Sequence, residues 1–388
     1  MATSYEFIDA SGKRRHYVDT KRYWWLLSVV YPLLPVVAIG IHFLTGLAWT
    51  LAIPLLFSYL ALPLLDWLLG EDSSNPPEQT VPALEHDRFY RNLVIATVPL
   101  HYVSVIVAAW WAATAGLSWW AWLVLAVTAG LASGMAINTG HELGHKRTGL
   151  ERWMARLALA VPGYGHFSIE HNIGHHKHVA TPEDCASARF NESIYGFALR
   201  EIPGGIRRAW RLERARLNRQ QKPVWHWHNE ILGNLAITIG YQAALVIWLG
   251  WPMLAFLVIH NAVAWFQLTS ANYIEHYGLL RQRRPDGRYE RCQPHHSWNS
   301  NHVVTNLLLF HLQRHSDHHA NPLRRYQSLR DFDHLPQLPS GYLGMYLLAY
   351  VPPLWFRIMN RRLLALDHVK GDLSRVNRGL TEPARTDS

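Results

Sequence analysis

The chain contains very little cysteine. Its 388 residues include only two, Cys185 and Cys292. Two thiols cannot build a disulfide framework, and they cannot supply the four cysteine ligands of a protein-held iron–sulfur centre. A metal site made of cysteines alone is therefore excluded, and the 24 histidines are the outstanding feature of the composition.

Charged residues are missing from three long parts of the chain. No Asp, Glu, Lys or Arg occurs in residues 23–65, 92–141 or 231–274. A helix needs about 20 apolar residues to cross a bilayer, so each stretch is long enough for two crossings joined by a tight turn. We therefore expect an integral membrane protein, and a soluble globular fold is excluded.

These stretches predict six membrane-spanning helices arranged as three hairpins. Gly46, Gly116 and Gly250 lie at the expected turns, where the reversing chain needs a permissive backbone. The expected crossings are 24–43, 47–67, 93–113, 118–138, 231–249 and 252–271, with ends that are accurate to about 2–4 residues. The predicted fold class is an all-α integral membrane protein with six transmembrane helices in three hairpins and a His-rich helical cap in the cytoplasm.

Basic residues distinguish the two sides of the predicted bundle. Lysine and arginine are abundant before the first crossing and between the fourth and the fifth, and they are essentially missing from the three expected turns. Loops rich in Lys and Arg stay in the cytoplasm. We therefore expect both termini and both large segments outside the membrane to be cytoplasmic.

The predicted organisation has six parts. The apolar stretch 341–356 contains Pro352 and Pro353 and is too short to span a membrane, so it should lie at the interface or pack on the cap. The residues from Gly371 onward are polar and are expected to be disordered. The parts are a cytoplasmic N-terminal segment (1–22), transmembrane helices 1–4 (23–141), a cytoplasmic His-box segment (142–230), transmembrane helices 5–6 (231–274), a second cytoplasmic His-box segment with an interfacial helix (275–370) and a polar tail (371–388).

A run of arginines within residues 207–222 has two interpretations. Basic residues beside a membrane rest on anionic lipid headgroups, or they dock an acidic partner protein. Their distribution in a membrane protein does not indicate nucleic acid as a partner. The residues considered for docking are Arg207, Arg208, Arg211 and Arg214.

Histidines gather in four short clusters close to the predicted crossings. The clusters are HELGH (141–145), EHNIGHH (170–176), NYIEH (272–276) and HSDHH (315–319). Residues three or four apart share one face of a helix. The pairs expected on a shared metal are His141 with His145, His171 with His175, and His315 with His318 or His319. His176 and His319 each follow another histidine and can reach toward a second metal.

The number of clustered histidines predicts two metal ions. Four ligands saturate a structural zinc, whereas the four clusters hold nine imidazoles. Imidazole binds iron, copper, nickel and zinc alike, so the ligand type does not identify the metal. The nine are His141, His145, His171, His175, His176, His276, His315, His318 and His319.

Carboxylates beside the clusters are candidates for orienting the ligands. A carboxylate that accepts the second ring N–H of a ligand fixes its tautomer. An ordinary surface salt bridge is the alternative for each of them. The candidates are Glu142, Glu170, Asp184, Glu275 and Asp317.

Two other functions share some of these features. HELGH matches the H-E-x-x-H motif of zinc peptidases, in which Glu142 would be the general base. Such a site needs three protein ligands and would leave six clustered histidines without a role. A metal transporter that uses a histidine relay would place polar residues at mid-depth in the crossings, whereas here they gather at one end.

The clusters and their flanking residues resemble the signature boxes of membrane-bound alkane 1-monooxygenases. The matching segments are HELGHK (141–146), EHNIGHHKHVATPEDCASAR (170–189), NYIEHYGL (272–279) and LQRHSDHH (312–319). Histidine boxes of this general kind also occur in fatty-acid desaturases and sterol hydroxylases, so a membrane fatty-acyl desaturase or hydroxylase is the alternative. NYIEHYGL is the box that separates alkane hydroxylases from xylene-type relatives, and the likeness covers nearly the whole chain.

The resemblance implies a monooxygenase with a non-haem diiron centre held by the nine clustered histidines. Such an enzyme inserts one atom of O₂ into the terminal methyl of a medium- or long-chain n-alkane and gives the 1-alkanol. Its electrons come from rubredoxin, which acts in trans and is reduced by an NAD(P)H-dependent rubredoxin reductase. No haem, flavin or nucleotide is bound directly, and the implied location is the bacterial inner membrane.

The resemblance also implies that bulk on the second crossing limits alkane length. Ser58 lies between Phe57 and Tyr59 on that crossing, where its small side chain would leave room for longer chains. A linear alkane partitions into the bilayer and can enter a hydrocarbon-lined channel at little desolvation cost. We therefore expect Ser58 to line the substrate channel.

Overall fold

The computed structural model describes residues 3–146 and 148–379. Six helical spans in this part of the chain are long and apolar enough to cross a membrane, which confirms the predicted number of crossings. Their bounds are Arg22–Thr45, Ala48–Leu69, Arg88–Thr114, Trp119–Gly144, Glu230–Leu249 and Pro252–His276. The chain is a multi-pass, mainly helical membrane protein.

The first two spans are built from short helical segments, and the other four are single helices. Prolines divide the first two, because proline has no N–H for the helix and stands at the first positions of a new segment. The segments are α1 (Leu27–Val30) and α2 (Leu34–Thr45), then α3 (Ile53–Leu56), a π-helical turn (Phe57–Ala61) and α4 (Leu62–Leu69). The single helices are α6 (Arg88–Thr114), α7 (Trp119–Gly144), α12 (Glu230–Leu249) and α13 (Pro252–His276).

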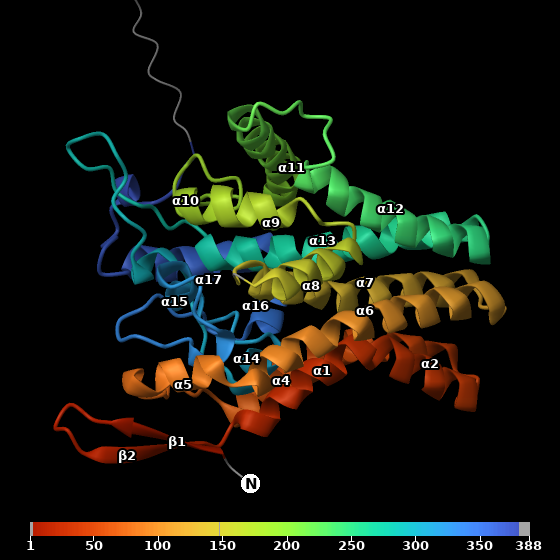
Figure 1. Cartoon of the computed structure of the whole chain (residues 1–388), viewed down its shortest axis with the longest axis horizontal. Helices are drawn as coiled ribbons and strands as arrows, with labels where there is room; N and C mark the ends of the chain where they lie inside the picture. Colours follow the sequence, from red (N-terminus) through yellow and green to blue (C-terminus); the bar gives the residue numbers. More distant parts are fainter. Residues whose placement is uncertain (1–2, 147, 380–388) are drawn as a thin grey trace, which may run out of the picture.

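The three hairpin turns lie together at one end of the bundle, on the right of Figure 1, and the segments between the hairpins lie at the other end. Gly46, Gly116 and Gly250 adopt positive φ values in these turns, which glycine does without steric cost. Exposed tryptophans occur near both ends of the spans, among them Trp119 and Trp251 near the turns and Trp225 and Trp227 at the opposite end. Two such bands are typical of the two membrane interfaces.

Helix α7 forms the centre of the bundle and packs on α6, α8 and α13. Its Gly130 and Gly134 allow the backbone of α13 to approach closely. A Cβ atom at Gly130 would lie 2.5 Å from the carbonyl oxygen of His260, and one at Gly134 would lie 2.7 Å from the Cβ of Gln267. Small residues at such crossings let membrane helices pack tightly, and this contact aligns the ends of α7 and α13 that carry histidines.

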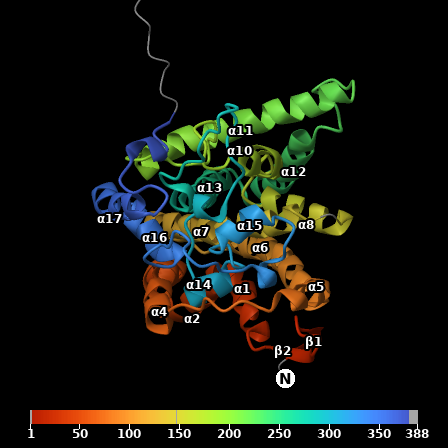
Figure 2. The same cartoon turned by 90° about the vertical axis from the view of Figure 1, so that its left-hand side faces the viewer.

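A cap made of the 26-residue helix α11 and several short helices covers one end of the bundle. Figure 2 looks at this end and shows α11 stretched across one side of it. The cap helices are α5 (Val81–His86), α8 (Gly149–Ala160), α9 (Phe167–Ile169), α10 (His176–His178), α11 (Ile194–Arg219), α14 (Val303–Leu308), α15 (His315–Ala320), α16 (Tyr342–Ala349) and α17 (Pro352–Ala365). Helix α16 packs on α13 and α4, so the apolar stretch that begins at residue 341 contributes to the core as well as to the cap.

The two ends of the chain contain structure that the sequence analysis did not anticipate. Strands β1 (Thr3–Ile8) and β2 (Arg14–Asp19) form an antiparallel hairpin. The Asp9 side chain closes its turn by accepting from the backbone N–H groups of Ser11 and Lys13. The Asp-Ala-Ser-Gly sequence between the strands was the available signal for this turn.

The expectation of a disordered tail was wrong for residues 371–379. Val376 is buried and pairs with Leu279 in a β-bridge. The backbone of Asn377 bonds to Phe190 and to Gly278, so this stretch is fixed because its polar backbone finds partners next to the third histidine cluster. The rest of the predicted polar tail, residues 380–388, lies outside the described residues.

We expect Gly130→Ala to destabilise the protein by about 1–3 kcal/mol, because the new Cβ must push α13 away from α7. Thermal or denaturant unfolding of the purified protein in detergent measures this loss. Gly40→Ala is the matched control, since Gly40 lies on an exposed face of α2, where an added Cβ would meet no other atom within 4 Å. Equal stability of the two variants would contradict the close packing of α7 on α13.

Candidate metal centre

The nine clustered histidines converge in two groups at the cap end of the bundle. The first group contains His141, His145, His171, His176 and His318, and the second contains His175, His276, His315 and His319. Helix α7 supplies His141, α13 supplies His276 at its last position, and α15 supplies three members. Side chains that are distant in the sequence thus meet because two membrane helices end at the same level and two cap segments fold over them.

Ring nitrogens within each group point at one another. In the first group the Nε2 atom of His318 lies 2.9 Å from Nε2 of His141 and 3.2 Å from Nε2 of His176. The Nε2 atom of His176 lies 3.1 Å from Nε2 of His171. In the second group the Nε2 atom of His315 lies 3.1 Å from that of His276 and 2.9 Å from that of His319.

These distances fit shared metal ligation better than hydrogen bonding. A histidine nitrogen bound to a metal such as zinc lies about 2.0–2.1 Å away, so two nitrogens at a right angle are about 2.9 Å apart. A single N–H on His318 cannot be directed at both of its neighbours, and the same holds for His315. The Nε2 atoms of His145 and His175 are buried without a hydrogen-bond partner among the described residues, and a metal ion would satisfy them.

The protonation state of the rings also suits metal binding. Burial, followed by the positive charge of neighbouring histidines, lowers the pKa of several rings well below the usual value, so that they are neutral and offer a lone pair. This applies to His145, His171, His176, His315, His318 and His319.

Two rings are oriented by bonds on their far nitrogen. Nδ1 of His175 donates to Asp184 at 2.9 Å, and Nδ1 of His276 donates to the carbonyl oxygen of His296 at 3.2 Å. Both bonds leave Nε2 facing its group. Hydrogen bonds of this kind fix the tautomer of a ligand and raise its basicity.

Arg208 holds the Asp184 carboxylate in place from the other side. Its guanidinium donates to Asp184 at 2.7 Å and also pairs with Glu170. Burial favours the protonated form of Asp184, but the charges of His175 and Arg208 hold the pKa of its carboxyl well below the usual range. A Cβ at Gly174 would lie 2.8 Å from Nε of Arg208, so this close approach needs glycine there.

The other carboxylate candidates differ from the sequence-based expectation. Glu142 pairs with Lys146, Glu170 with Arg208, and Asp317 with Arg324. A cation thus takes the place that a histidine N–H was expected to fill. The first two pairs are buried, whereas Asp317 is buried and its partner Arg324 is partly exposed. Glu275 lies 3.3 Å from Nε2 of His315, which is the nitrogen that faces the group, so this carboxylate reaches the centre itself.

The division of the second cluster also differs from the expected pairing. A π-helical turn spans Glu170–His175, and residues five apart bond across such a turn. His171 therefore joins His176 in the first group, and His175 turns to the second group. In the last cluster His315 shares its group with His319, while His318 joins the first group.

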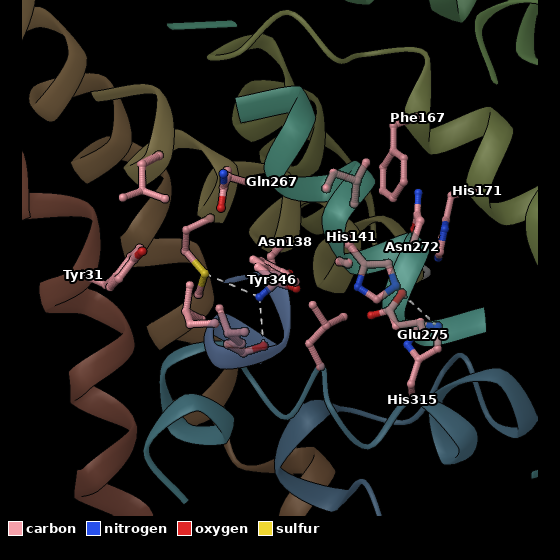
Figure 3. Close-up of a pocket in the computed structure, with 18 residues that line it drawn as sticks. Tyr31, Asn138, His141, Phe167, His171, Gln267, Asn272, Glu275, His315 and Tyr346 are labelled. Atoms are coloured by element: carbon pink, nitrogen blue, oxygen red, sulfur yellow. Dashed lines mark hydrogen bonds and ion pairs between the residues drawn. The ribbon is translucent and has the colours of Figure 1, made fainter. Parts of the chain in front are cut away.

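A narrow cavity of about 60 Å³ ends at the two groups. Figure 3 shows His141, His171, His315 and Glu275 at one end of it and Tyr31 at the other. Most of the remaining wall is apolar and comes from α7, α13 and α16. An apolar cavity with polar atoms at one end suits a small apolar ligand that is acted on at its tip.

Ser58 lies behind this cavity rather than along it. It is fully buried, and its hydroxyl lies 2.8 Å from the hydroxyl of Tyr31, which does line the cavity. Ser58 lies on the π-helical turn Phe57–Ala61, and Tyr31 opens the 3-10 segment Tyr31–Leu33 that follows α1. Ser58 is thus placed to affect the cavity through Tyr31.

Several polar residues of the cavity were not singled out from the sequence. Asn138, Gln267 and Asn272 line it, and Asn272 donates at 3.2 Å to Glu201 of α11. Burial raises the pKa of Glu201 to about 7. The sequence could have indicated these cavity residues, because they are amide side chains within stretches that contain no charged residue.

Comparison with known proteins matches this arrangement to a described group of enzymes. The fatty acid desaturase family matches residues 117–349, a region that contains all four histidine clusters. Alkane 1-monooxygenase 1 of Alcanivorax borkumensis is 54% identical over 93% of this chain and 89% of its own length. Alkane 1-monooxygenase of Ectopseudomonas oleovorans is 55% identical over 97% of this chain and 92% of its own length.

The chain belongs to the alkane 1-monooxygenase family. It is thus an enzyme of the oxidoreductase class, and the predicted resemblance is confirmed. The xylene/toluene monooxygenase hydroxylase component of Pseudomonas putida is 30% identical over 58% of this chain and 59% of its own length. The named relatives favour the alkane monooxygenase over the acyl desaturase alternative.

The four arginines considered for docking differ in exposure: one is buried and three are exposed. Arg208 is buried against Glu170 and Asp184, so it cannot contact a partner protein. The inward face of α11 carries Phe197, Glu201, Gly205, Arg208 and Ala209, and the helical period of this stripe was the signal that Arg208 points inward. Arg207, Arg211 and Arg214 are exposed on the outward face.

We expect Asp184→Asn to weaken metal binding by about 10- to 100-fold, because the amide leaves His175 without the carboxylate that orients it. The metal content of the purified variant after dialysis against a chelator measures the effect, and a parallel thermal unfolding curve shows whether the fold persists. Glu183→Gln is the matched control, since within the described part of the chain Glu183 pairs with Arg283 and Tyr289 at the surface and with no histidine. A folded Asp184→Asn protein that keeps its metal as Glu183→Gln does would contradict this role.

Proposed function

We propose that this chain is a non-haem diiron monooxygenase that hydroxylates the terminal methyl of medium- and long-chain n-alkanes to 1-alkanols. It would use O₂ and electrons from rubredoxin. The observation that carries the proposal is the narrow apolar cavity that ends at two groups of histidine nitrogens. One iron would be held by the group of five and the other by the group of four.

An alkane methyl has no polar atom that a side chain can attack or protonate. Two irons bound by these rings would supply the O₂-dependent redox chemistry that no side chain provides. The chain itself binds and orients the substrate, because the cavity admits an apolar chain and places its tip beside His141, His171 and His315. The apolar wall also keeps water from the reacting methyl.

The reaction takes up two protons when the second oxygen atom of O₂ leaves as water. Glu201 is placed to hold one of them. Its Oε1 accepts from Asn272, which lines the cavity, and its Oε2 accepts from Thr269 at 2.8 Å. A carboxyl with a pKa of about 7 can both hold and release a proton near neutral pH.

A basic groove beside the first histidine group is suited to an acidic electron donor such as rubredoxin. Its volume is about 570 Å³, and its lining includes Gly144 and Asn172 next to His145 and His171. Its acidic members Glu213 and Glu230 pair with Arg216 and Arg156. The exposed Arg152, Lys177 and Arg219 therefore leave a net positive surface that would attract an acidic protein.

The charge pattern supports a sidedness for the enzyme. The cap and both termini would face the cytoplasm, because their basic residues are retained there. In a bacterium this corresponds to the inner membrane, with the donor groove open to soluble rubredoxin and its NAD(P)H-dependent reductase.

Metal and product analysis of the purified enzyme tests the proposal. We expect two irons per chain, and 1-alkanols from octane to hexadecane when rubredoxin and its reductase are supplied. His276→Ala should lose iron and activity, whereas His16→Ala, an exposed histidine on β2, should keep both. One zinc per chain without oxygen uptake would overturn the proposal.

Reversal of charge in the donor groove tests the docking surface. Arg152→Glu combined with Arg219→Glu should raise the KM for rubredoxin about ten-fold at low salt, because electrostatic steering is lost. The kcat at saturating rubredoxin should stay near the unmodified value. Arg14→Glu, on the β-hairpin, is the control, and an equal change in that variant would refute the assignment.

Added bulk at residue 58 tests how the cavity limits chain length. We expect Ser58→Trp to shift activity toward shorter alkanes, because the indole would push Tyr31 into the cavity. Ser58→Ala removes the hydroxyl contact without adding bulk and should keep the chain-length profile. Product yields across an n-alkane series measure both, and identical profiles would show that Tyr31 does not bound the cavity.

A further inference from the structure

A second and larger hollow lies between α11 and α12, away from the histidine groups. Its volume is about 840 Å³. Ile206 and Trp210 of α11, Ile231 and Leu235 of α12 and Trp265 of α13 provide apolar walls. None of the nine clustered histidines lines it, so the metal centre and its cavity do not account for this groove.

Two arginines without acidic partners stand on the rim of the groove. Arg207 and Arg211 line it, are exposed and lie four residues apart, so they share one face of α11. Three other arginines of this helix are paired, namely Arg200 with Glu192, Arg208 with Glu170 and Asp184, and Arg216 with Glu213. Among the described residues no carboxylate forms an ion pair with Arg207 or Arg211, and their charge is available to a bound anion.

The position of the groove relative to the membrane indicates what fills it. Its α12 residues, Ile231, Leu235 and Thr238, span the first two turns of a membrane-spanning helix, or about 10 Å of depth. Trp225 and Trp227, which precede this helix, are 76% and 81% exposed and mark the interface. The apolar wall therefore lies at the depth of acyl chains, and the two arginines lie at the level of lipid phosphates.

We propose that this groove binds one anionic phospholipid, with its phosphate on Arg207 and Arg211 and an acyl chain along Ile231, Leu235 and Trp265. A basic pocket between membrane helices on the cap side matches an anionic headgroup. Guanidinium groups form strong, directed bonds to phosphate oxygens. A zwitterionic lipid carries an ammonium group that would meet the same two arginines, so the site favours phosphatidylglycerol over phosphatidylcholine.

Lipid retention measured by native mass spectrometry tests this site. The full-length enzyme is reconstituted with equal amounts of phosphatidylglycerol and phosphatidylcholine and is then released in detergent. The unmodified enzyme should retain one phosphatidylglycerol in preference to phosphatidylcholine. Each arginine near a membrane contributes about a five-fold gain in affinity, so Arg207→Gln with Arg211→Gln should weaken retention about 30-fold.

Matched variants separate this site from general surface charge and from misfolding. Arg214→Gln removes an exposed charge from the same helix outside the groove and should retain the lipid. Leu235→Trp should displace the lipid by filling the groove while both arginines remain. Ile239→Trp, one turn further along α12 and outside the groove, should not. Inorganic phosphate should fail to compete, because it lacks the acyl chain.

Four outcomes would overturn the proposal. These are equal retention of the two lipids, unchanged retention in the double arginine variant, equal loss in Arg214→Gln, and displacement by inorganic phosphate alone. A double variant that retains lipid but shows a raised KM for the electron donor would identify the rim as a protein-docking surface instead. The lipid-retention readouts are independent of iron content, so the test of the lipid site stands even if the proposed diiron chemistry fails.

Discussion

Imidazole nitrogens that face one another across 2.9–3.2 Å place lone pairs in direct opposition. In an interior of low dielectric this repulsion is strong, and a cation held between the nitrogens converts it into attraction. The surrounding helices hold the rings in this arrangement. The close contact of α7 with α13 fixes His141 and His276, and the cap segments bring the other rings over them. The buried pair of Asp184 and Arg208 then holds His175 against the tendency of the rings to turn apart.

The membrane architecture could be predicted because bilayer thickness sets a length that sequence must match. Three charge-free stretches predicted six crossings, and nine of the twelve ends lie within two residues of the expected ones. The third span begins five residues earlier than expected, and the fourth and sixth end six and five residues later, so that they include His141 and His276. The set of nine histidines could be collected for a related reason. Their clusters lie at the ends of crossings that must finish at one interface, so topology alone brings His141 and His276 to the same level.

Geometry inside the cap could not be predicted in the same way. The division of rings between the two groups depends on a π-helical turn at Glu170–His175, and sequence periodicity assumes an α-helix. The burial of Arg208 depends on which face of α11 packs inward, a pattern present in the sequence but hidden by the run of neighbouring arginines. The pairing of Glu142 with Lys146 shows that a buried cation competes with a histidine for the same carboxylate.

The π-helical turn also determines how the centre tolerates insertions and deletions. In an α-helix each residue is rotated by about 100° about the helix axis relative to the residue before it. A π-turn is closed by a hydrogen bond between residues five apart, so it contains one residue more than an α-turn. Removal of a single residue between His171 and His175 would restore α geometry. His176 would then follow His171 by four residues and would stay on the same helix face. In an α-helix the present five-residue spacing would instead turn the two rings away from one another, so the π-helical turn is what keeps His171 and His176 in one group.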